Sequence, residues 1–388
     1  MNQAQSLPEP SADALQHSQK LVARIREEID SNNGSISFRR YMEMALYEPA
    51  LGYYVAGTNK IGAQGDFITA PEVSPLFSQC IAQQCKEVLE ETNGMILELG
   101  AGTGIMAADI LLALEADDSL PEHYYILDVS PDLKQRQKET LKERTPHLLK
   151  YVKWLSQPPD SFKGIILGNE VLDAMPVDVF TQQNDTVFKH HVIWEDGKLC
   201  EQLQVADDDL REKVLALNIP HEATPYTSEI NPNLSGWFEN ISNCLEKGVI
   251  LLADYGYPRK EYYFEERNKG TLICHYQHLV NEAPLHYSGL QDITASVDFT
   301  AVAEAADDAG LDVMGFTSQV NFLTNNDLEA LFMKALDKHP DAQYKLAQQV
   351  RTLSLPAEMG ERFKFIALGK HYDKSLRGFS SLDQRIRL

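Results

Sequence analysis

The sequence predicts an α/β fold in which a mainly parallel β-sheet is covered by helices on both faces. Two observations predict it. Short hydrophobic runs of strand length recur along the chain, and segments with helical spacing of apolar residues separate them. Strands joined by helical crossovers form parallel sheets whose two faces are both buried. The predicted strands are residues 95–99, 124–127, 151–154, 164–167 and 249–253.

The chain before the first strand is predicted to be mostly helical. Leu21, Ile25 and Ile29 recur at helical spacing, and either Ser35 or Ser37 can cap a second helix. The predicted elements are a loose lead-in over residues 1 to about 18, a helix through Leu21 and Ile29, helices over residues 38–46 and 75–90, and a loop rich in glycine and aromatic residues over 48–75.

Later segments add helices, hairpins and one long connection. Ser130-Pro131-Asp132 suits a helix start, because serine caps helices and proline fits their first turn. Apolar and polar residues alternate over 178–205 around Asn184-Asp185 and Asp196-Gly197, which predicts hairpins. The remaining predicted elements are helices over 103–115, 299–309 and about 326–354, strands over 311–316 and 362–368, and a connection over 256–297 whose length favours a functional role.

Charge and composition narrow the classes of partner. The chain has 35 basic and 57 acidic residues, a net charge of −22, and such a surface repels nucleic acid. Its start lacks the pattern of a signal peptide, and no apolar run approaches the length of a membrane span. Five scattered cysteines with no CxxC pair are typical of a reducing compartment. We expect a cytoplasmic protein with no nucleic-acid partner and no membrane insertion.

A glycine-rich turn follows the first predicted strand. It has the form E-x-G-x-G-x-G, from Glu98 to Gly104. Glycines there permit positive φ and close approach of a ligand, and the amides at the helix start favour a carboxylate. Asp128 ends the next strand, where an acid reaches a ribose diol. The pattern indicates S-adenosylmethionine as cofactor, with Glu98, Gly100, Gly102, Gly104 and Asp128 as binding residues.

A nicotinamide dinucleotide is the main alternative cofactor. The pattern G-x-G-x-x-G/A fails from Gly100, where Ile105 fills the last position, but it fits from Gly102, where Ala107 does. Glu98 with Gly100 favours the methyltransferase form, and the chain shows no recognisable constellation for hydride transfer. A turn that only packs a strand against a helix is the non-functional interpretation.

Longer blocks along the chain are more specific than the turn. They are Tyr47-Glu48-Pro49 with Gly52-Tyr53-Tyr54, Gly65-Asp66-Phe67-Ile68-Thr69-Ala70-Pro71-Glu72 with Phe77, Val129-Ser130-Pro131, Asn169-Glu170-Val171-Leu172-Asp173-Ala174-Met175-Pro176, Asp254-Tyr255-Gly256-Tyr257, Gly270-Thr271-Leu272, and Asp292-Ile293-Thr294 with Val297-Asp298-Phe299. Together with the turn, they resemble the MidA family from about residue 35 to about residue 370. Asp128 and Cys274-His275 depart from the family pattern.

This resemblance implies a class I, Rossmann-like methyltransferase fold and the methylation of arginine in a protein substrate. Mitochondrial members act as complex I assembly factors, with symmetric dimethylation of a complex I subunit. We expect a bacterial member whose protein substrate is a respiratory complex I subunit or another protein. The expected parts are a helical N-terminal extension with a cofactor-covering loop over residues 1–92, and a methyltransferase core over 93–388 with substrate-facing insertions at about 178–240, 256–297 and 320–360.

The end of the fourth predicted strand supplies the catalytic candidates. Asn169 is expected to bind the cofactor beside the methyl donor. Carboxylates clamp a guanidinium in bidentate fashion, so Glu170 is the first catalytic candidate and Asp173 the second. The alternatives are a structural ion pair for Glu170 and a helix cap for Asp173. No metal is expected, because a sulfonium is already an activated leaving group.

Two other segments complete the predicted site. By the resemblance, the loop before the third helix folds over the cofactor. Asp66 or Thr69 then binds its methionine end and Glu72 faces the substrate. An ordinary turn before a proline-started helix is the alternative. Tyr255 follows the fifth strand and is expected to pack against substrate.

Three rival functions remain open from the sequence. They are a non-catalytic assembly factor that uses the fold to bind a partner, a small-molecule methyltransferase, and an NAD-dependent oxidoreductase. Intact Glu98, Gly100 and Asp128 argue against an inactive cofactor site.

Overall fold

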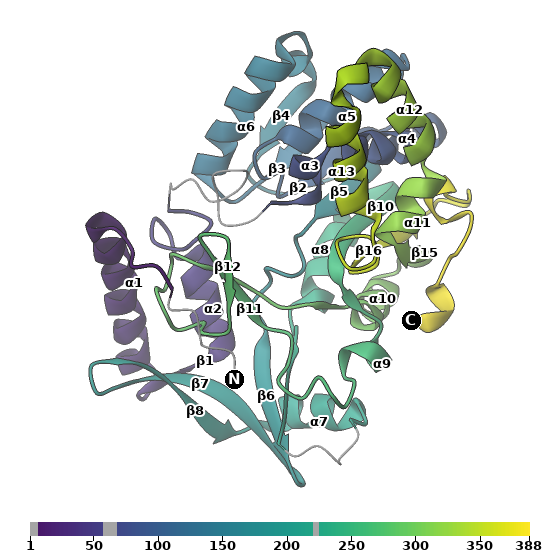
Figure 1. Ribbon diagram of the computed structural model, residues 1–388. Coiled ribbons are helices and arrows are strands. Elements are labelled where there is room, and N and C mark those ends of the chain that lie inside the picture. The colour runs from purple at the N-terminus through teal and green to yellow at the C-terminus, as the bar shows by residue number, and fades with distance from the viewer. Residues whose placement is uncertain (1–6, 57–67, 220–224) are drawn as a thin grey trace.

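The computed structural model describes residues 7–56, 68–219 and 225–388, and it confirms the α/β fold (Figure 1). The strands of the main sheet are β2 (Met95–Leu99), β3 (Tyr124–Leu127), β4 (Val152–Leu155), β5 (Phe162–Asn169), β10 (Leu245–Tyr257), β14 (Val297–Asp298), β15 (Asp312–Ser318) and β16 (Phe363–Lys370). Their order is β15-β16-β10-β5-β2-β3-β4, with β14 paired to β10. The five predicted strands from β4 to β10 run parallel, whereas β16 is antiparallel to both of its neighbours. The parallel sheet is therefore confirmed except at this edge.

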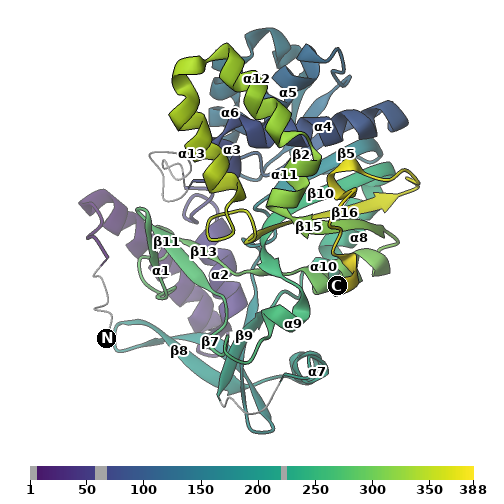
Figure 2. The same cartoon turned by 45° about the vertical axis from the view of Figure 1, so that its right-hand side comes forward.

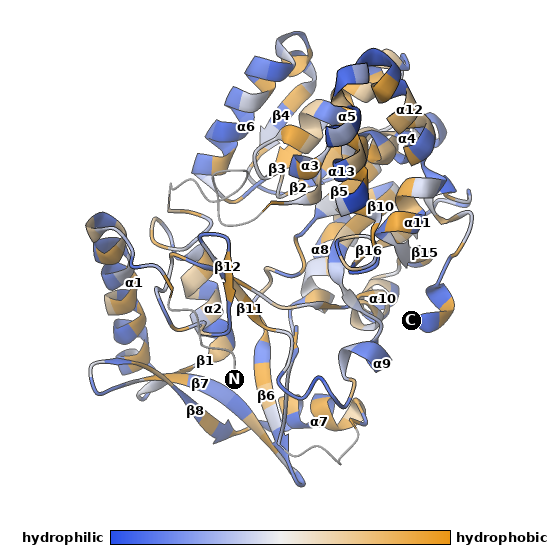
Figure 3. Ribbon diagram, viewed as in Figure 1, coloured by the Kyte–Doolittle hydropathy of each residue, from blue (hydrophilic) through white to orange (hydrophobic). Residues whose placement is uncertain are grey.

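Helices cover and connect the strands. They are α1 (Ala12–Ser31), α2 (Phe38–Tyr47), α3 (Ala70–Val73), α4 (Pro75–Thr92), α5 (Ile105–Ala116), α6 (Pro131–Arg144), α7 (Asp208–Ala216), α8 (Leu234–Cys244), α9 (Arg259–Tyr262), α10 (Phe299–Asp308), α11 (Gln319–Asn325), α12 (Leu328–Lys338) and α13 (Gln343–Ser354). Short 3₁₀ turns lie at Pro146–Tyr151, Pro340–Ala342, Arg377–Phe379 and Arg385–Arg387. Ser37, and not Ser35, caps α2, and Ser130 caps α6 as predicted. Figure 3 shows α6 as mostly hydrophilic, since Gln137 and Leu141 are its buried residues.

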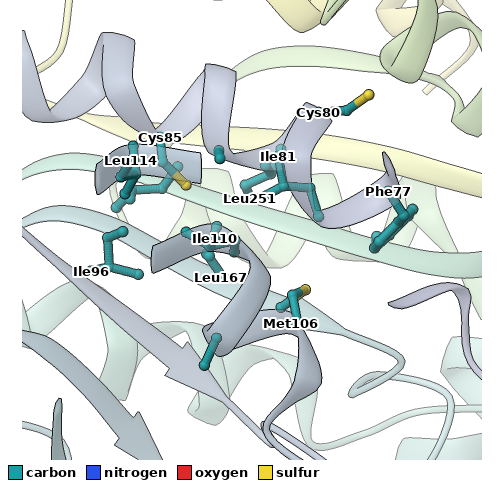
Figure 4. Close-up of a cluster of buried hydrophobic side chains, with 14 of the residues drawn as sticks. Phe77, Cys80, Ile81, Cys85, Ile96, Met106, Ile110, Leu114, Leu167 and Leu251 are labelled. Atoms are coloured by element: carbon teal, nitrogen blue, oxygen red, sulfur yellow. The ribbon is translucent and has the colours of Figure 1, made fainter. Parts of the chain in front are cut away.

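Both faces of the main sheet are buried. In β10, Val249 and Leu251 belong to one hydrophobic cluster, and Ile250 and Leu252 belong to another. Figure 4 shows the first cluster, in which side chains of α4 and α5 meet those of β2, β5 and β10. The second cluster packs the opposite face against α8 and α10. Successive strand residues point to opposite faces, so two apolar layers fix the sheet between helices.

Two smaller sheets lie beside the main one. The first contains β1 (Ser35–Ser37), β6 (Asp178–Gln183), β7 (Thr186–Glu195), β8 (Lys198–Val205) and β9 (Tyr226–Ile230). β6, β7 and β8 form the predicted hairpins. In Figures 1 and 2 this sheet lies at the end of the molecule opposite α5 and α6. The other small sheet contains β11 (Ile273–Tyr276), β12 (Leu279–Asn281) and β13 (Asp292–Thr294).

The structure corrects two predictions about irregular segments. The lead-in is shorter than predicted, because Ser11 caps α1 and the helix begins at Ala12. The connection over 256–297 is not a bare loop, because α9, β11, β12 and β13 form within it. Long-range pairing of β11 with β13 satisfies its backbone, and this pairing has no local sequence signal. Of the helices in the described residues, none is long and apolar enough to cross a membrane.

Candidate functional site

A cavity of about 1350 Å³ opens at the carboxyl ends of β2, β3, β5 and β10. Ligands of open α/β sheets bind in this position. Ten of the predicted site residues line the cavity: Thr69, Glu72, Glu98, Gly100, Gly102, Asp128, Asn169, Glu170, Asp173 and Tyr255. Gly104 is not one of the lining residues, and Asp66 lies outside the described residues.

The glycine turn between β2 and α5 needs its glycines for two reasons. Gly100, Gly102 and Gly104 all have positive φ, at 62°, 51° and 83°. A β-carbon at Gly104 would also lie 3.0 Å from the backbone of Gln137 in α6. Gly104 therefore sets the packing of two helices, whereas Gly100 and Gly102 present backbone to the cavity.

Glu98 is buried beneath this turn. Its Oε2 accepts a 2.6 Å hydrogen bond from the Tyr124 hydroxyl. Burial raises the pKa of Glu98 to about 7, although the bond from Tyr124 opposes the rise. The Glu98 side chain lines the cavity and is held from β3 by this bond.

Asp128 is oriented by two donors, one that caps α6 and one in the middle of that helix. Its Oδ1 accepts from the Ser130 amide at 2.8 Å, and its Oδ2 accepts from Gln137 Nε2 at 2.8 Å. Gln137 Nε2 also donates to the Gly102 carbonyl, and Gln137 Oε1 accepts from Trp154 Nε1. Sequence reasoning missed Gln137, whose only signal is a polar residue on the inner face of α6. It joins the glycine turn to Asp128.

The α3 segment contacts the glycine turn from above. The Glu72 carboxylate accepts a short hydrogen bond from the Thr103 hydroxyl, which places Glu72 against the turn. Thr69 precedes α3 and lines the cavity without capping the helix through its side chain. Both side chains therefore lie at the end of the cavity formed by β2 and α5.

Asn169 and Glu170 stand at the end of β5, between the glycine turn and β10. Glu170 has φ 53°, a left-handed conformation that is rare for a residue with a long side chain, and its amide donates to the Ala253 carbonyl. Asn169 Nδ2 donates to Glu170 Oε1 at 3.1 Å. Burial, and then the neighbouring Asp173, raise the pKa of Glu170 to about 8. No Lys or Arg of the described residues pairs with Glu170, so the structural ion pair is not observed.

Asp173 lies in a turn and not at a helix start. No helix follows it before β6, so its interpretation as a helix cap is wrong. Its side chain is 5% exposed, and burial raises its pKa while the nearby Tyr255 hydroxyl opposes that rise. The turn is held by Asp254, whose Oδ2 accepts from the amides of Val171, Leu172 and Asp173 at 2.9–3.2 Å.

A further carboxylate comes from β13, far along the chain. Asp292 is 2% exposed and lines the cavity, and its Oδ1 accepts from the Tyr54 hydroxyl at 2.9 Å. Tyr54 stacks on Tyr47 with ring centroids 5.5 Å apart. All three residues belong to blocks that carry the family resemblance, but sequence reasoning assigned them no role. This end of the cavity thus combines Glu170, Asp173 and Asp292 with tyrosine rings.

The cavity fits S-adenosylmethionine together with a second molecule. Small-molecule sites span roughly 300–1,000 Å³, so about 1350 Å³ leaves room beyond the cofactor. The buried Asn169 Oδ1 has no hydrogen-bond partner and is available to an ammonium group. Gly100 and Gly102, both with positive φ, line the cavity and present the backbone beside β2 to a ligand.

Comparisons with known proteins agree with this geometry. Residues 80–317 match the model of a family described as "Putative S-adenosyl-L-methionine-dependent methyltransferase". The chain is 29% identical to the human protein arginine methyltransferase NDUFAF7, mitochondrial, over 88% of this chain and 81% of that protein. The Drosophila melanogaster homologue is also 29% identical, over 96% of this chain and 91% of that protein.

A solved structure extends the likeness to the whole chain. It is a COG1565 superfamily member from Burkholderia thailandensis bound to S-adenosyl-homocysteine, with 38% identity, a TM-score of 0.94 and coverage of 99% of this chain and 100% of that one. The predicted fold, cofactor and MidA resemblance are confirmed. The chain belongs to this family of S-adenosylmethionine-dependent methyltransferases.

Proposed function

We propose that this methyltransferase transfers the methyl group to an arginine side chain of a protein substrate. The observation that carries the proposal is the group of three cavity carboxylates, Glu170, Asp173 and Asp292, beside tyrosine rings. A guanidinium is planar and cationic. It pairs with carboxylates in bidentate fashion and stacks on aromatic faces. Glu170 and Asp173 follow β5 and Asp292 begins β13, and both aspartates lie close enough to Glu170 to raise its pKa.

The cofactor residues have distinct roles in this proposal. Gly100 and Gly102 present backbone to the methyl donor, and Asp128 accepts from its ribose hydroxyls. Asn169 Oδ1 and Thr69 meet its methionine end. Glu98 supports the turn from below through its bond to Tyr124. When bound there, S-adenosylmethionine supplies a methyl group on a sulfonium, an activated leaving group.

The acceptor residues orient the guanidinium and remove its proton. Glu170 and Asp292 hold the group so that one nitrogen faces the methyl carbon, and Tyr255 packs beside it. The new bond joins that nitrogen to the methyl carbon as the carbon–sulfur bond breaks. The nitrogen's proton passes to Glu170, whose raised pKa suits it to accept a proton. The incoming cation itself favours the carboxylate form of Glu170 before transfer.

The names of the relatives support the same acceptor. Several curated relatives with 24–29% identity are named protein arginine methyltransferases. A complex I subunit as substrate and a cytoplasmic location stay predictions. A small-molecule acceptor is the rival, and it differs only in what enters the acceptor end of the cavity.

The proposal is tested by locating the transferred methyl group. Purified protein is incubated with methyl-labelled S-adenosylmethionine and lysate from a strain that lacks this protein. We expect labelled protein bands whose hydrolysate contains labelled N-methylarginine. Glu170→Gln is expected to reduce labelling by about 100-fold or more, because an oriented charge at the reacting group is lost.

A matched variant separates the mechanism from a change in folding. Glu329→Gln alters an exposed glutamate on α12 and is expected to label like the wild type. Cofactor affinity, measured by calorimetry, should be unchanged in both variants. Label in another amino acid or in small molecules would overturn the arginine acceptor. Unchanged labelling by Glu170→Gln would remove Glu170 from the mechanism.

A further inference from the structure

A second, smaller cavity adjoins the acceptor end of the main one. It has a volume of about 180 Å³ and shares Tyr255, Ile273 and Arg362 with the main cavity. Small-molecule sites span roughly 300–1,000 Å³, so this space suits one side chain rather than a second ligand. A chain segment that places its arginine beside Tyr255 therefore has its neighbouring residues close to this side cavity.

The charges of the side cavity are cationic. Among the described residues, the charged ones that line it are Arg267 and Arg362, and none that lines it is acidic. A positively charged cavity is unusual in a chain with 57 acidic and 35 basic residues. The nearby acids Glu261 and Glu361 form ion pairs with Arg387 and Lys364 instead.

Arg267 is held in place without losing its capacity to bind an anion. Its guanidinium lies 3.9 Å from the centre of the Tyr257 ring, and Nη1 donates to the carbonyls of Glu261 and Tyr262. Nε and Nη2 have no acceptor among the described residues. Arginine carries five N–H donors in a planar fork, so a fixed guanidinium with free donors is prepared for a carboxylate.

Arg362 stands between the two cavities. It precedes β16, is exposed, and makes no ion pair with the described residues. An anion in the side cavity can therefore contact arginines from two segments of the chain. Tyr255 also lines both cavities.

We propose that the side cavity binds an acidic side chain of the protein substrate, close in sequence to the arginine that is methylated. The inference rests on the proposed arginine acceptor and adds sequence specificity to it. The carboxylates of the acceptor end bind the substrate arginine. Arg267 and Arg362 favour substrates that carry an acidic residue close to that arginine.

Two fluorescein-labelled peptides test the inference. Each has one arginine in a Gly/Ser background, with either glutamate or glutamine two to four residues away on both sides. Binding is measured by anisotropy in the presence of S-adenosylhomocysteine. We expect the glutamate peptide to bind about tenfold more tightly at low salt, a difference of about 1.4 kcal/mol. The preference should weaken as ionic strength rises.

Variants assign the preference to the side cavity. Arg362→Gln should reduce it severalfold, and Arg362→Glu should make the glutamine peptide the tighter ligand. Arg267→Gln is the second variant, with folding checked by its melting temperature. Arg351→Gln changes an exposed arginine on α13 that lines neither cavity, and it should keep the full preference.

The outcomes separate this inference from the proposed function. Equal affinity of the two peptides, or a preference that survives both Arg362→Gln and Arg267→Gln, would overturn the inference. Preferential binding of the glutamate peptide with no methyl transfer to its arginine would support the side cavity and count against the arginine acceptor.

Discussion

The central part of the cofactor end, the glycine turn with Asp128, comes from neighbouring parts of the sequence, whereas the acceptor end is assembled from four distant segments. Glu98, Gly102, Asp128 and Gln137 all lie within two consecutive β–α units. The acceptor end takes Tyr54 from the segment after α2, Glu170 from the end of β5, Tyr255 from β10 and Asp292 from β13. A site made by local turns is determined by short-range geometry, while a site made by distant segments depends on how the sheets pack.

The largest effect is expected from removing the Asp254 side chain, which holds the turn after β5 at the acceptor end. Asp254 accepts hydrogen bonds from four backbone amides, those of Val171, Leu172, Asp173 and Tyr255. Asp254→Ala leaves buried donors unpaired and should lower the free energy of unfolding by about 3 kcal/mol. Loss of this turn should reduce methyl transfer by about 100-fold or more. Urea denaturation and the labelling assay measure both effects.

Asp312→Ala is the control for this change, because Asp312 is an exposed residue of β15. Wild-type activity in a folded Asp254→Ala variant would contradict the claim that this carboxylate shapes the acceptor end.

The matching change at the cofactor end is Asp128→Ala. Loss of a charged acceptor removes about 1.5–3 kcal/mol, so the Kd for S-adenosylmethionine should rise about 10- to 100-fold. At saturating cofactor, the acceptor KM should stay close to that of the wild type, because Asp128 follows β3, which β2 separates from β5 and Glu170. Calorimetry measures the Kd for the cofactor, and steady-state kinetics measures the acceptor KM. Glu143→Ala, at an exposed position of α6, is the control and should change neither the cofactor Kd nor the acceptor KM. An equal loss of cofactor affinity in both variants would exclude a specific role for Asp128.

The ionisation of Glu170 predicts a pH dependence at the acceptor end only. Burial and Asp173 raise its pKa to about 8, and the reaction needs the carboxylate. The value of kcat/KM should therefore rise with pH and level off above about pH 8, falling about tenfold per unit below the pKa. Cofactor affinity should not follow this profile. A flat kcat/KM profile would contradict Glu170 as the proton acceptor.

The same group affects stability with a definite sign. The folded-state pKa lies above the ordinary value of 4.5, so the protonated form is the one that the fold favours. Its stabilising contribution is complete below the ordinary value and is lost as the pH rises through about 8. Glu170→Gln should therefore be more stable than the wild type at pH 9 and equally stable at pH 4, as measured by urea denaturation.

The smallest effect is expected from Tyr54→Phe. This change removes the hydroxyl that donates to Asp292 Oδ1 and leaves the ring that stacks on Tyr47. A single hydrogen bond to a charged group is worth about 1.5–3 kcal/mol when lost, and a replacement partner from solvent reduces this. We expect a severalfold rise in acceptor KM with unchanged cofactor Kd. Tyr344→Phe, at a residue 83% exposed on α13, is the control, and equal kinetics in the two variants would exclude a role for the Tyr54 hydroxyl in orienting Asp292.

Much of the fold was predictable because its signals are local. The runs at β2, β5 and β10 are long and apolar, and capping residues such as Ser130 mark helix starts. The antiparallel direction of β16 was not predictable, since β16 is a continuous run of buried residues like β10, which belongs to the parallel part of the sheet. Pairing direction depends on where the preceding helices return the chain.

By itself the sequence determined the central part of the cofactor end, because the glycine turn and Asp128 follow from spacing within two β–α units. It also named Glu170 and Asp173, because they follow a strand directly. Only the tertiary structure decided that Tyr54 and Asp292 lie beside these two residues and that Asp254 holds their turn. It also decided that Arg267 and Arg362 line the side cavity together. The physical reason is that these contacts join segments up to 238 residues apart, and their energies depend on packing that no local pattern records.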